Sequence, residues 1–318
     1  MAWLRISLET SGELAEAVAD VLARSVPGGV AVEAPHPGLT GTTQQTPVRI
    51  TAYLPIDEES SARRRAIEEG LWHLSQIAPL PPAQFTSVEA QDWAETWKER
   101  YQPIPIGERL LIVPSWVGLP SSSRLPLVLD PGMAFGTGTH PSTQQCLLAL
   151  ERHLQPGTTV IDLGCGSGIL AIAAARLGAG RVLALDIDPL AVEATIENCR
   201  RNAAAETVRT ELGSLDDLRG PRFARYRPAD ILLANILAPV LIEMLSVGLA
   251  DQIQPGGLAI LSGILDEQVA GVLARARAVG LDPVEVLEAE DWRTPVLRKA
   301  IAPSKAGSDD SNSRGLSN

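Results

Sequence analysis

The first hundred residues alternate between the hydrophobic spacing of strands and that of helices. Apolar side chains at every second position predict strands, and apolar side chains three or four positions apart predict helices. The expected elements are a strand at 3–8, a helix at 11–26, strands at 29–33 and 48–54, a helix at 57–76 and a strand at 85–90. This βαββαβ order is that of a ferredoxin-like α+β domain, which we expect at residues 1–90.

From Asp130 onward the pattern changes to a regular alternation of buried strands and helices. The expected strands lie at 158–163, 181–186, 207–212, 229–235, 257–262, 283–288 and 295–301. Strands separated by helices form a parallel sheet covered on both faces, and the final two strands, with no helix between them, fit an antiparallel hairpin at the sheet edge. Residues 130–302 are therefore expected to form a doubly wound, Rossmann-like α/β domain with an antiparallel edge strand.

Residues 91–129 connect the two expected domains. They contain Trp93 and Trp97, four positions apart and hence on one face of a short helix, where packing between domains is favoured over contact with a substrate. The Pro-rich stretch that follows is strand-like, with a linker at Leu119–Pro126. At the other end of the chain, residues 303–318 are small and polar, so we expect a disordered tail.

The charge and the cysteine content limit the class of protein. The net charge is −11, from 27 basic and 38 acidic residues, and no basic segment stands out. This balance argues against direct nucleic-acid binding. An acidic surface would favour encounter with a basic partner, and the alternative is that the acidic charge only keeps the protein soluble. Cys146, Cys165 and Cys199 lack the paired spacing of disulfide or metal sites, so we expect reduced thiols and no metal.

No segment is typical of a signal peptide or of a membrane span. The N-terminus has no basic stretch leading into an apolar core. The most apolar later stretch, Ile231–Leu245, is interrupted by Asn235, Pro239 and Glu243. We expect a cytoplasmic protein that does not contact membranes.

Three alternate glycines follow the first strand of the α/β domain, where a doubly wound sheet binds its ligand. Gly164, Gly166 and Gly168 allow an unusual backbone turn and close approach of a ligand, and a tight turn without a ligand is the alternative. A dinucleotide-binding loop needs its third glycine at the position of Ile169. Together with Asp162, the glycines instead resemble the first motif of class I S-adenosylmethionine-dependent methyltransferases.

Asp186 ends the second strand of this domain, 22 residues after Gly164. Its carboxylate can accept hydrogen bonds from both hydroxyls of a ribose, which S-adenosylmethionine and dinucleotides share. Asp188 and Pro189 are expected to begin the next helix as its N-cap and first residue. Asp186 therefore supports a nucleoside-containing cofactor but does not distinguish S-adenosylmethionine from a dinucleotide.

Asn235 is expected at the same edge of the sheet, at the end of the fourth strand. In amino methyltransferases this position is commonly polar and orients the nitrogen that accepts the methyl group. An amide oxygen can accept an N–H and hold the nitrogen lone pair toward the methyl donor. The alternative is an asparagine that ends the strand or caps the following helix.

A loop rich in glycine and threonine, Asp130–Thr143, precedes the first strand of the domain. Its composition suggests a loop folded tightly over a ligand, with Thr143 opening the next helix near the cofactor and Phe135 forming a wall of the methyl-transfer site. His140 is a candidate base, and a loop residue held by hydrogen bonds is the alternative.

These segments together resemble one family. The ribosomal protein L11 methyltransferases contain segments similar to QDWAETWKERYQPIPIGERLLIVPSW, MAFGTGTHPST, VIDLGCGSGILAIAAARLGA, LDIDPLAV, ANILAPVL and LSGIL in this chain. The resemblance is strong from about Gln91 to Ala302. It implies S-adenosyl-L-methionine contacts at Thr143, Gly164, Asp186 and Asn235.

The resemblance also implies a domain organisation and a reaction. A small N-terminal domain would recognise the ribosomal protein, and a flexible linker would join it to the catalytic domain. That domain would methylate lysine side chains and the N-terminal amine of a large-subunit ribosomal protein. We expect a monomer. The alternatives are a methyltransferase of another protein amide or of ribosomal RNA, an inactive S-adenosylmethionine-binding module and, disfavoured by Ile169, an NAD-dependent dehydrogenase.

Overall fold

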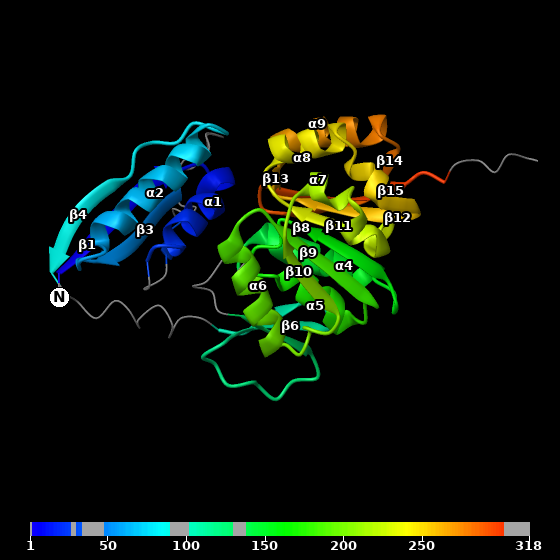
Figure 1. Cartoon of the computed structure of the whole chain (residues 1–318), viewed down its shortest axis with the longest axis horizontal. Coiled ribbons are helices and arrows are strands. Elements are labelled where there is room, and N and C mark those ends of the chain that lie inside the picture. The colour runs from blue at the N-terminus through cyan, green and yellow to red at the C-terminus, as the bar shows by residue number, and fades with distance from the viewer. Residues whose placement is uncertain (1, 27–29, 34–47, 90–101, 130–137, 302–318) are drawn as a thin grey trace, which may run out of the picture.

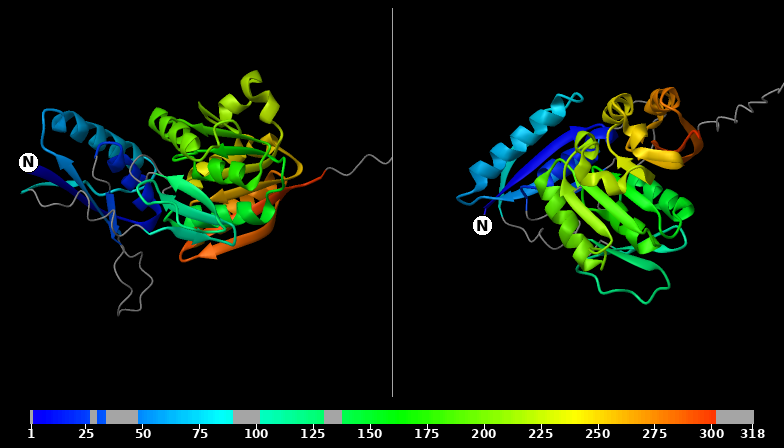
Figure 2. Two further views of the ribbon diagram at one scale, coloured as in Figure 1. Left: turned by 90° about the horizontal axis from the view of Figure 1, so that it is seen from below. Right: turned by 45° about the vertical axis from the view of Figure 1, so that its right-hand side comes forward.

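The computed structural model describes most of the chain, and its elements form two lobes side by side (Figure 1 and Figure 2). The described residues are 2–26, 30–33, 48–89, 102–129 and 138–301. Several sequence predictions fall outside these ranges: the loop at 34–46, Trp93, Trp97, Phe135 and the tail at 303–318.

The N-terminal lobe is a four-stranded antiparallel sheet with two helices on one face (Figure 1). Its elements are β1 (Ala2–Thr10), α1 (Gly12–Ala23), β2 (Val30–Glu33), β3 (Val48–Pro55), α2 (Ser60–Ser75) and β4 (Gln84–Glu89). The sheet order is β2-β3-β1-β4. Alternate side chains of β1 and β3, among them Ile6 and Ile50, are buried against helix residues such as Leu22 and Ile67. The βαββαβ order predicted from the sequence is confirmed.

Helix α2 begins at Ser60, later than the predicted start at Asp57. The Asp57 carboxylate accepts the N–H of Glu59 at 3.0 Å, and the Asp57 carbonyl accepts that of Ser60 at 3.2 Å. Such a local side-chain bond offers the backbone an alternative to the helix, so these residues form a turn before it.

A three-stranded sheet follows in the chain. It contains β5 (Ile104–Ile106), β6 (Leu110–Pro114) and β7 (Leu125–Leu129). The strand-like character predicted for this stretch is confirmed, but the linker predicted at Leu119–Pro126 runs into β7. Its last two residues, Leu125 and Pro126, pair in parallel with Leu110 and Leu111 of β6.

Two side chains of the C-terminal lobe fix this small sheet by bonding its backbone. This lobe, residues 138–301, is expected to be the catalytic one and is called the catalytic lobe below. The Glu151 carboxylate accepts the N–H groups of Glu108 and Arg109 at 2.7 and 3.0 Å. The Asn202 amide accepts the N–H of Val128 and donates to the Val128 carbonyl, both at 2.7 Å. The three strands are therefore bound firmly to the catalytic lobe.

The catalytic lobe is built on an eight-stranded sheet. Its strands are β8 (Thr159–Leu163), β9 (Arg181–Asp186), β10 (Val208–Leu212), β11 (Ala229–Asn235), β12 (Ile253–Ser262), β13 (Ile264–Leu265), β14 (Leu281–Ala289) and β15 (Trp292–Lys299). The order is β10-β9-β8-β11-β12-β15-β13, with β14 paired to β15. The neighbours from β10 to β12 are parallel, and β15 is antiparallel to both β12 and β14. The doubly wound class is as predicted, with the antiparallel strand one position inside the edge.

Helices cover both faces of this sheet (Figure 1). One face carries α4 (Pro141–His153), α5 (Ile169–Leu177) and α6 (Pro189–Arg201), and the other carries α7 (Leu215–Leu218), η2 (Pro221–Tyr226), α8 (Ala238–Ser246), η3 (Leu249–Gln252) and α9 (Asp266–Ala278). In β8, Val160 packs on the first face and Ile161 on the second, which explains the continuous apolar run of this strand. No helix in the part of the chain that the structure describes is long and apolar enough to cross a membrane.

The three cysteines are buried in the catalytic lobe, and none is in a disulfide. Burial raises the pKa of the Cys146 and Cys199 thiols to about 12 and holds the pKa of Cys165 well above its usual range. Among the described residues, no group of three or more His, Cys, Asp or Glu side chains is placed to hold a metal ion.

Candidate functional site

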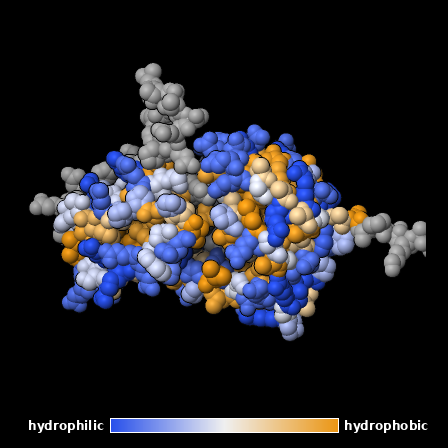
Figure 3. Space-filling view, turned by 90° about the horizontal axis from the view of Figure 1, so that it is seen from above, coloured by the Kyte–Doolittle hydropathy of each residue, from blue (hydrophilic) through white to orange (hydrophobic). Residues whose placement is uncertain are grey.

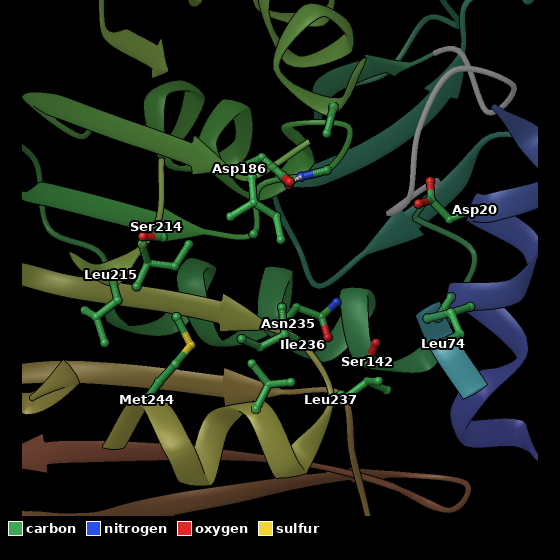
Figure 4. A pocket seen from close by; sticks show the side chains of 18 of the residues that line it. Asp20, Leu74, Ser142, Asp186, Ser214, Leu215, Asn235, Ile236, Leu237 and Met244 are labelled. Carbon is green, nitrogen blue, oxygen red and sulfur yellow. Dashed lines mark hydrogen bonds between the residues drawn. The ribbon is translucent and has the colours of Figure 1, made fainter. Parts of the chain in front are cut away.

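A cleft of about 490 Å³ lies at the carboxyl edge of the parallel strands, where the two lobes meet (Figure 4). The catalytic lobe lines it with the loops that follow β8, β9, β10 and β11, and the N-terminal lobe lines it with residues of α1 and α2. Apolar side chains are visible along the seam between the lobes (Figure 3). This edge is where doubly wound sheets bind their ligands.

The glycine loop after β8 has a backbone conformation that other residues rarely adopt. Gly164, Gly166 and Gly168 have φ values of +73°, +53° and +80°, all in the left-handed region. A Cβ on Gly164 would lie 2.9 Å from Ile236 Cγ2, and one on Gly168 would lie 2.7 Å from Thr195 Cγ2. The unusual turn predicted for these glycines is confirmed, and their contact with a cofactor stays a prediction.

Asp186 holds the glycine loop against the end of β9. Its Oδ2 accepts the N–H of Gly166 at 2.9 Å, and its Oδ1 accepts that of Asp188 at 3.0 Å. Because a carboxylate oxygen can accept two hydrogen bonds, both remain able to accept one from the cleft, which Asp186 lines (Figure 4). This arrangement fits the two hydroxyls of a ribose. Asp188 caps α6 by accepting the N–H of Leu190 at 3.0 Å, as predicted.

Asp162 lies on β8 behind the glycine loop and is completely buried. Its Oδ2 accepts the N–H of Ala171 in the first turn of α5 at 3.1 Å, whereas its Oδ1 has no hydrogen-bond partner among the residues that the structure describes. Burial raises the pKa of this carboxyl to about 7; the Ala171 hydrogen bond lowers it, and the charge of Asp186 raises it further. Asp162 does not line the cleft, so its charge would act from behind the glycine loop on a cationic ligand such as S-adenosylmethionine, which carries a sulfonium and an ammonium group.

Asn235 is the last residue of β11, and Thr143 lies opposite it in the first turn of α4. Asn235 Nδ2 donates to Thr143 Oγ1 at 3.2 Å, while Asn235 Oδ1 accepts no hydrogen bond from the described residues. Asn235 lines the cleft (Figure 4), and Thr143, which is buried, acts on the cleft through it. Leu237 is the N-cap of α8, so the alternative of Asn235 as a helix cap is excluded.

His140 is the N-cap of α4, which begins at Pro141, so Thr143 is the third residue of this helix and not its first. His140 Nδ1 accepts the N–H of Ser142 at 3.2 Å and lies 2.8 Å from the Ser142 hydroxyl. Burial lowers the pKa of the imidazole to about 4. The ring is therefore neutral and weakly basic at pH 7, and its contacts match the alternative of a residue held by hydrogen bonds.

The sequence pattern does not indicate several residues of the cleft. Trp292 begins β15, is 7% exposed and packs its ring edge-on against His140, with ring centroids 4.4 Å apart. A tryptophan at the point where the last hairpin returns to the carboxyl edge of the sheet is a signal that could have found it. Leu74 and the α1 residues carry no such signal, because their contact with the cleft depends on how the lobes meet.

The N-terminal lobe contacts the loops that carry the predicted site. Arg24 Nη1 forms an ion pair with Asp188 Oδ2 at 3.0 Å, and Arg24 Nε donates to Asp20 Oδ2 at 3.1 Å. Leu237, two residues after Asn235, packs against the hydrophobic core of the N-terminal lobe. The structure therefore brings the N-terminal lobe into direct contact with the loops that follow β9 and β11.

Known proteins share the sequence and fold that form this cleft. The family model described as Ribosomal protein L11 methyltransferase (PrmA) matches residues 2–300. Two relatives named Ribosomal protein L11 methyltransferase, from Chloroflexus aurantiacus and Herpetosiphon aurantiacus, are each 43% identical to this chain; the matches cover 94% and 95% of this chain and 98% and 100% of the relatives. A solved structure of a ribosomal protein L11 methylase from Lactobacillus delbrueckii subsp. bulgaricus is 33% identical, with a TM-score of 0.55, and the match covers 63% of this chain and 100% of that one.

Proposed function

Since the chain belongs to the ribosomal protein L11 methyltransferase family of S-adenosyl-L-methionine-dependent enzymes, we propose that it methylates ribosomal protein L11. The proposed acceptors are lysine side chains and the N-terminal amine. The observation that carries the proposal is the Asn235 amide, which Thr143 orients at the cleft that the glycine loop also lines. Methyl transfer to nitrogen needs a bound methyl donor and a neutral amine in line with its methyl group, and the glycine loop and the Asn235 amide would serve these two needs.

The cofactor side of the cleft consists of three features. Asp186 would bind the ribose hydroxyls, the glycine loop would let the cofactor approach the backbone closely, and Asp162 would compensate its positive charge. When bound, S-adenosyl-L-methionine supplies a sulfonium methyl group, so that a new N–C bond forms as the C–S bond breaks and a neutral thioether leaves.

The acceptor side must receive a neutral amine. A lysine has an ordinary pKa of about 10.4, so only about one in a few thousand is neutral at pH 7. A mostly apolar cleft disfavours the ammonium form, and the proton is released to water. Asn235 Oδ1 would accept a remaining N–H of the amine and so direct the nitrogen lone pair toward the methyl group.

We also propose that residues 1–90 recognise the substrate and that residues 130–302 methylate it. Ala17, Val21 and Leu74 of the N-terminal lobe form part of the cleft wall, so a substrate held by this lobe would lie close to the acceptor side. The net charge of −11 favours encounter with a basic ribosomal protein. The form proposed is a cytoplasmic monomer that acts without binding nucleic acid or membranes.

Incubation with labelled S-adenosyl-L-methionine tests this function. We expect transfer of label to purified L11, with mass spectrometry locating the added methyl groups on lysines and on the N-terminal amine. Label in ribosomal RNA with none in protein would support the RNA methyltransferase alternative. Cofactor binding without any transfer would support an inactive binding module.

Two variants separate the cofactor side from the acceptor side. Asn235→Ala removes the oriented acceptor, so we expect kcat to fall about ten- to hundredfold while cofactor affinity changes less than about threefold. Asp186→Ala should show the opposite pattern, with a dissociation constant for S-adenosyl-L-methionine at least about tenfold higher by calorimetry. Unchanged activity in both variants would rule out the proposed site.

A further inference from the structure

Behind the wall of the cleft, three buried polar side chains form a hydrogen-bonded chain. Thr294 Oγ1 donates to Gln145 Oε1 at 2.6 Å, and Ser262 Oγ lies 2.6 Å from Thr294 Oγ1. Gln145 Nε2 donates to the Trp292 carbonyl at 3.1 Å. Ser262 and Thr294 are 0% exposed and Gln145 is 2% exposed. The chain therefore runs from the end of β12 through β15 to α4 without contact with solvent.

The number of protons fixes the direction of these bonds. Because Gln145 Nε2 faces the Trp292 carbonyl, Gln145 Oε1 faces Thr294 and receives its single hydroxyl proton. Thr294 Oγ1 then accepts from Ser262. An apolar substitution of the same shape would leave a buried polar atom unpaired.

The three hydrogen-bonded side chains connect the parts of the structure that lie on either side of Asn235. Ser262 is the partner of Asn235 in the register of β11 and β12, and Gln145, at the other end of the hydrogen-bonded chain, lies on α4 directly after its first turn. Trp292, whose carbonyl the chain binds, lines the cleft and packs against the ring of His140. The positions of Trp292 and of this helical turn relative to Asn235 therefore depend on the same three side chains.

We propose that Gln145, Thr294 and Ser262 are positioning residues for methyl transfer, acting through Trp292 and the first turn of α4 on the space beside Asn235. The inference rests on the proposed function of the cleft. At 0–2% exposure, none of the three can contact a substrate itself. Because a misplacement of about 1 Å at a reacting centre can cost about a hundredfold in rate, their loss should affect turnover more than cofactor affinity.

Thr294→Val tests this role, because valine keeps the shape of threonine but cannot donate to Gln145. We expect kcat for L11 methylation to fall at least about tenfold, with cofactor affinity by calorimetry within about twofold of wild type. Thr294→Ser keeps the hydroxyl and should restore kcat to within about threefold. Thr158→Val is the matched control. Thr158 is also buried, and among the described residues its hydroxyl bonds only the backbone of Gln155, donating to the carbonyl and accepting the N–H at 3.2 Å, just before the opposite end of β8. This variant should leave kcat unchanged.

Ser262→Ala is a second variant that removes a hydroxyl without adding bulk, and it should lower kcat in the same way even if Thr294→Val does not fold. Equal losses of kcat in Thr294→Val and Thr158→Val would overturn the positioning role, as would a fall in kcat matched by an equal fall in cofactor affinity. A wild-type protein that binds the cofactor but does not methylate L11 would reject the proposed function, and this inference with it.

Discussion

Replacing Asp162 by Asn removes a buried ionisable group from the cofactor site and should change how stability depends on pH. The pKa of about 7 in the folded protein lies above the ordinary value of 3.8, because burial disfavours the carboxylate. A carboxyl whose pKa is raised by folding stabilises the native state while it is protonated there. That contribution is lost as the pH rises through 7.

The size of this contribution to stability depends on how far the pH lies below the pKa of Asp162 in the folded protein. At pH 5 the protonated carboxyl contributes about 3 kcal/mol to the free energy of unfolding, and at pH 8 it contributes almost nothing. His140 acts in the opposite direction, because a pKa lowered to about 4 means that the native state resists its protonation at pH 5. Only the difference between wild type and Asp162→Asn isolates the carboxyl.

Urea unfolding at pH 5 and pH 8 measures that difference. Relative to wild type, Asp162→Asn should be about 3 kcal/mol more stable at pH 8 than at pH 5. The positive charge of S-adenosyl-L-methionine favours the ionised carboxylate, so its affinity for wild type should weaken toward pH 5 by up to about a hundredfold, and its affinity for the variant much less. A stability difference that is independent of pH, or opposite in sign, would refute the raised pKa of Asp162.

Three other substitutions test the caps, the small sheet and the glycine loop. His140→Asn keeps a capping side chain but removes the imidazole. The difference in free energy of unfolding between this variant and wild type should therefore be about 2 kcal/mol more favourable to the variant at pH 5 than at pH 8. A difference that does not change between these pH values would contradict the lowered pKa of His140. Asn202→Ala leaves the backbone of Val128 unpaired and should lower the free energy of unfolding, measured by thermal unfolding, by about 2 kcal/mol. An unchanged Tm would show that the hydrogen bonds between Asn202 and Val128 do not contribute to stability. Gly168→Ala should lower the Tm and weaken cofactor binding more than Gly157→Ala, which has a similar φ but no atom within 4 Å of its added Cβ; equal effects would mean that backbone strain alone decides.

The regular elements of the catalytic lobe could be predicted because covered parallel strands are continuous apolar runs between helices. β13 could not, because two residues are too short for a periodicity, and it is defined by the pairing of Ile264 and Leu265 with Arg293 and Trp292. The start of β7 could not be predicted for a similar reason. Leu125 belongs to a strand only because β6 lies beside it.

In the candidate site, too, some residues could be predicted from the sequence, whereas some contacts depend on how distant elements pack. Gly164, Asp186 and Asn235 could be predicted because each follows or ends a parallel strand, and such ends meet at one edge of the sheet. The bond between Asn235 and Thr143 joins residues 92 positions apart and depends on how α4 packs against β11. The contact of Arg24 with the cofactor loops depends on the meeting of the lobes, which no local pattern encodes.

The burial of the three thiols makes the folded protein well suited to selective dye attachment. Cys146, Cys165 and Cys199 are buried and protonated at neutral pH, so they react poorly with maleimides. Glu69→Cys on α2 and Glu206→Cys on the catalytic lobe would place one reactive thiol at an exposed position of each lobe. Energy transfer between two dyes could then follow the separation of the lobes as cofactor and substrate are added, with every native cysteine left in place.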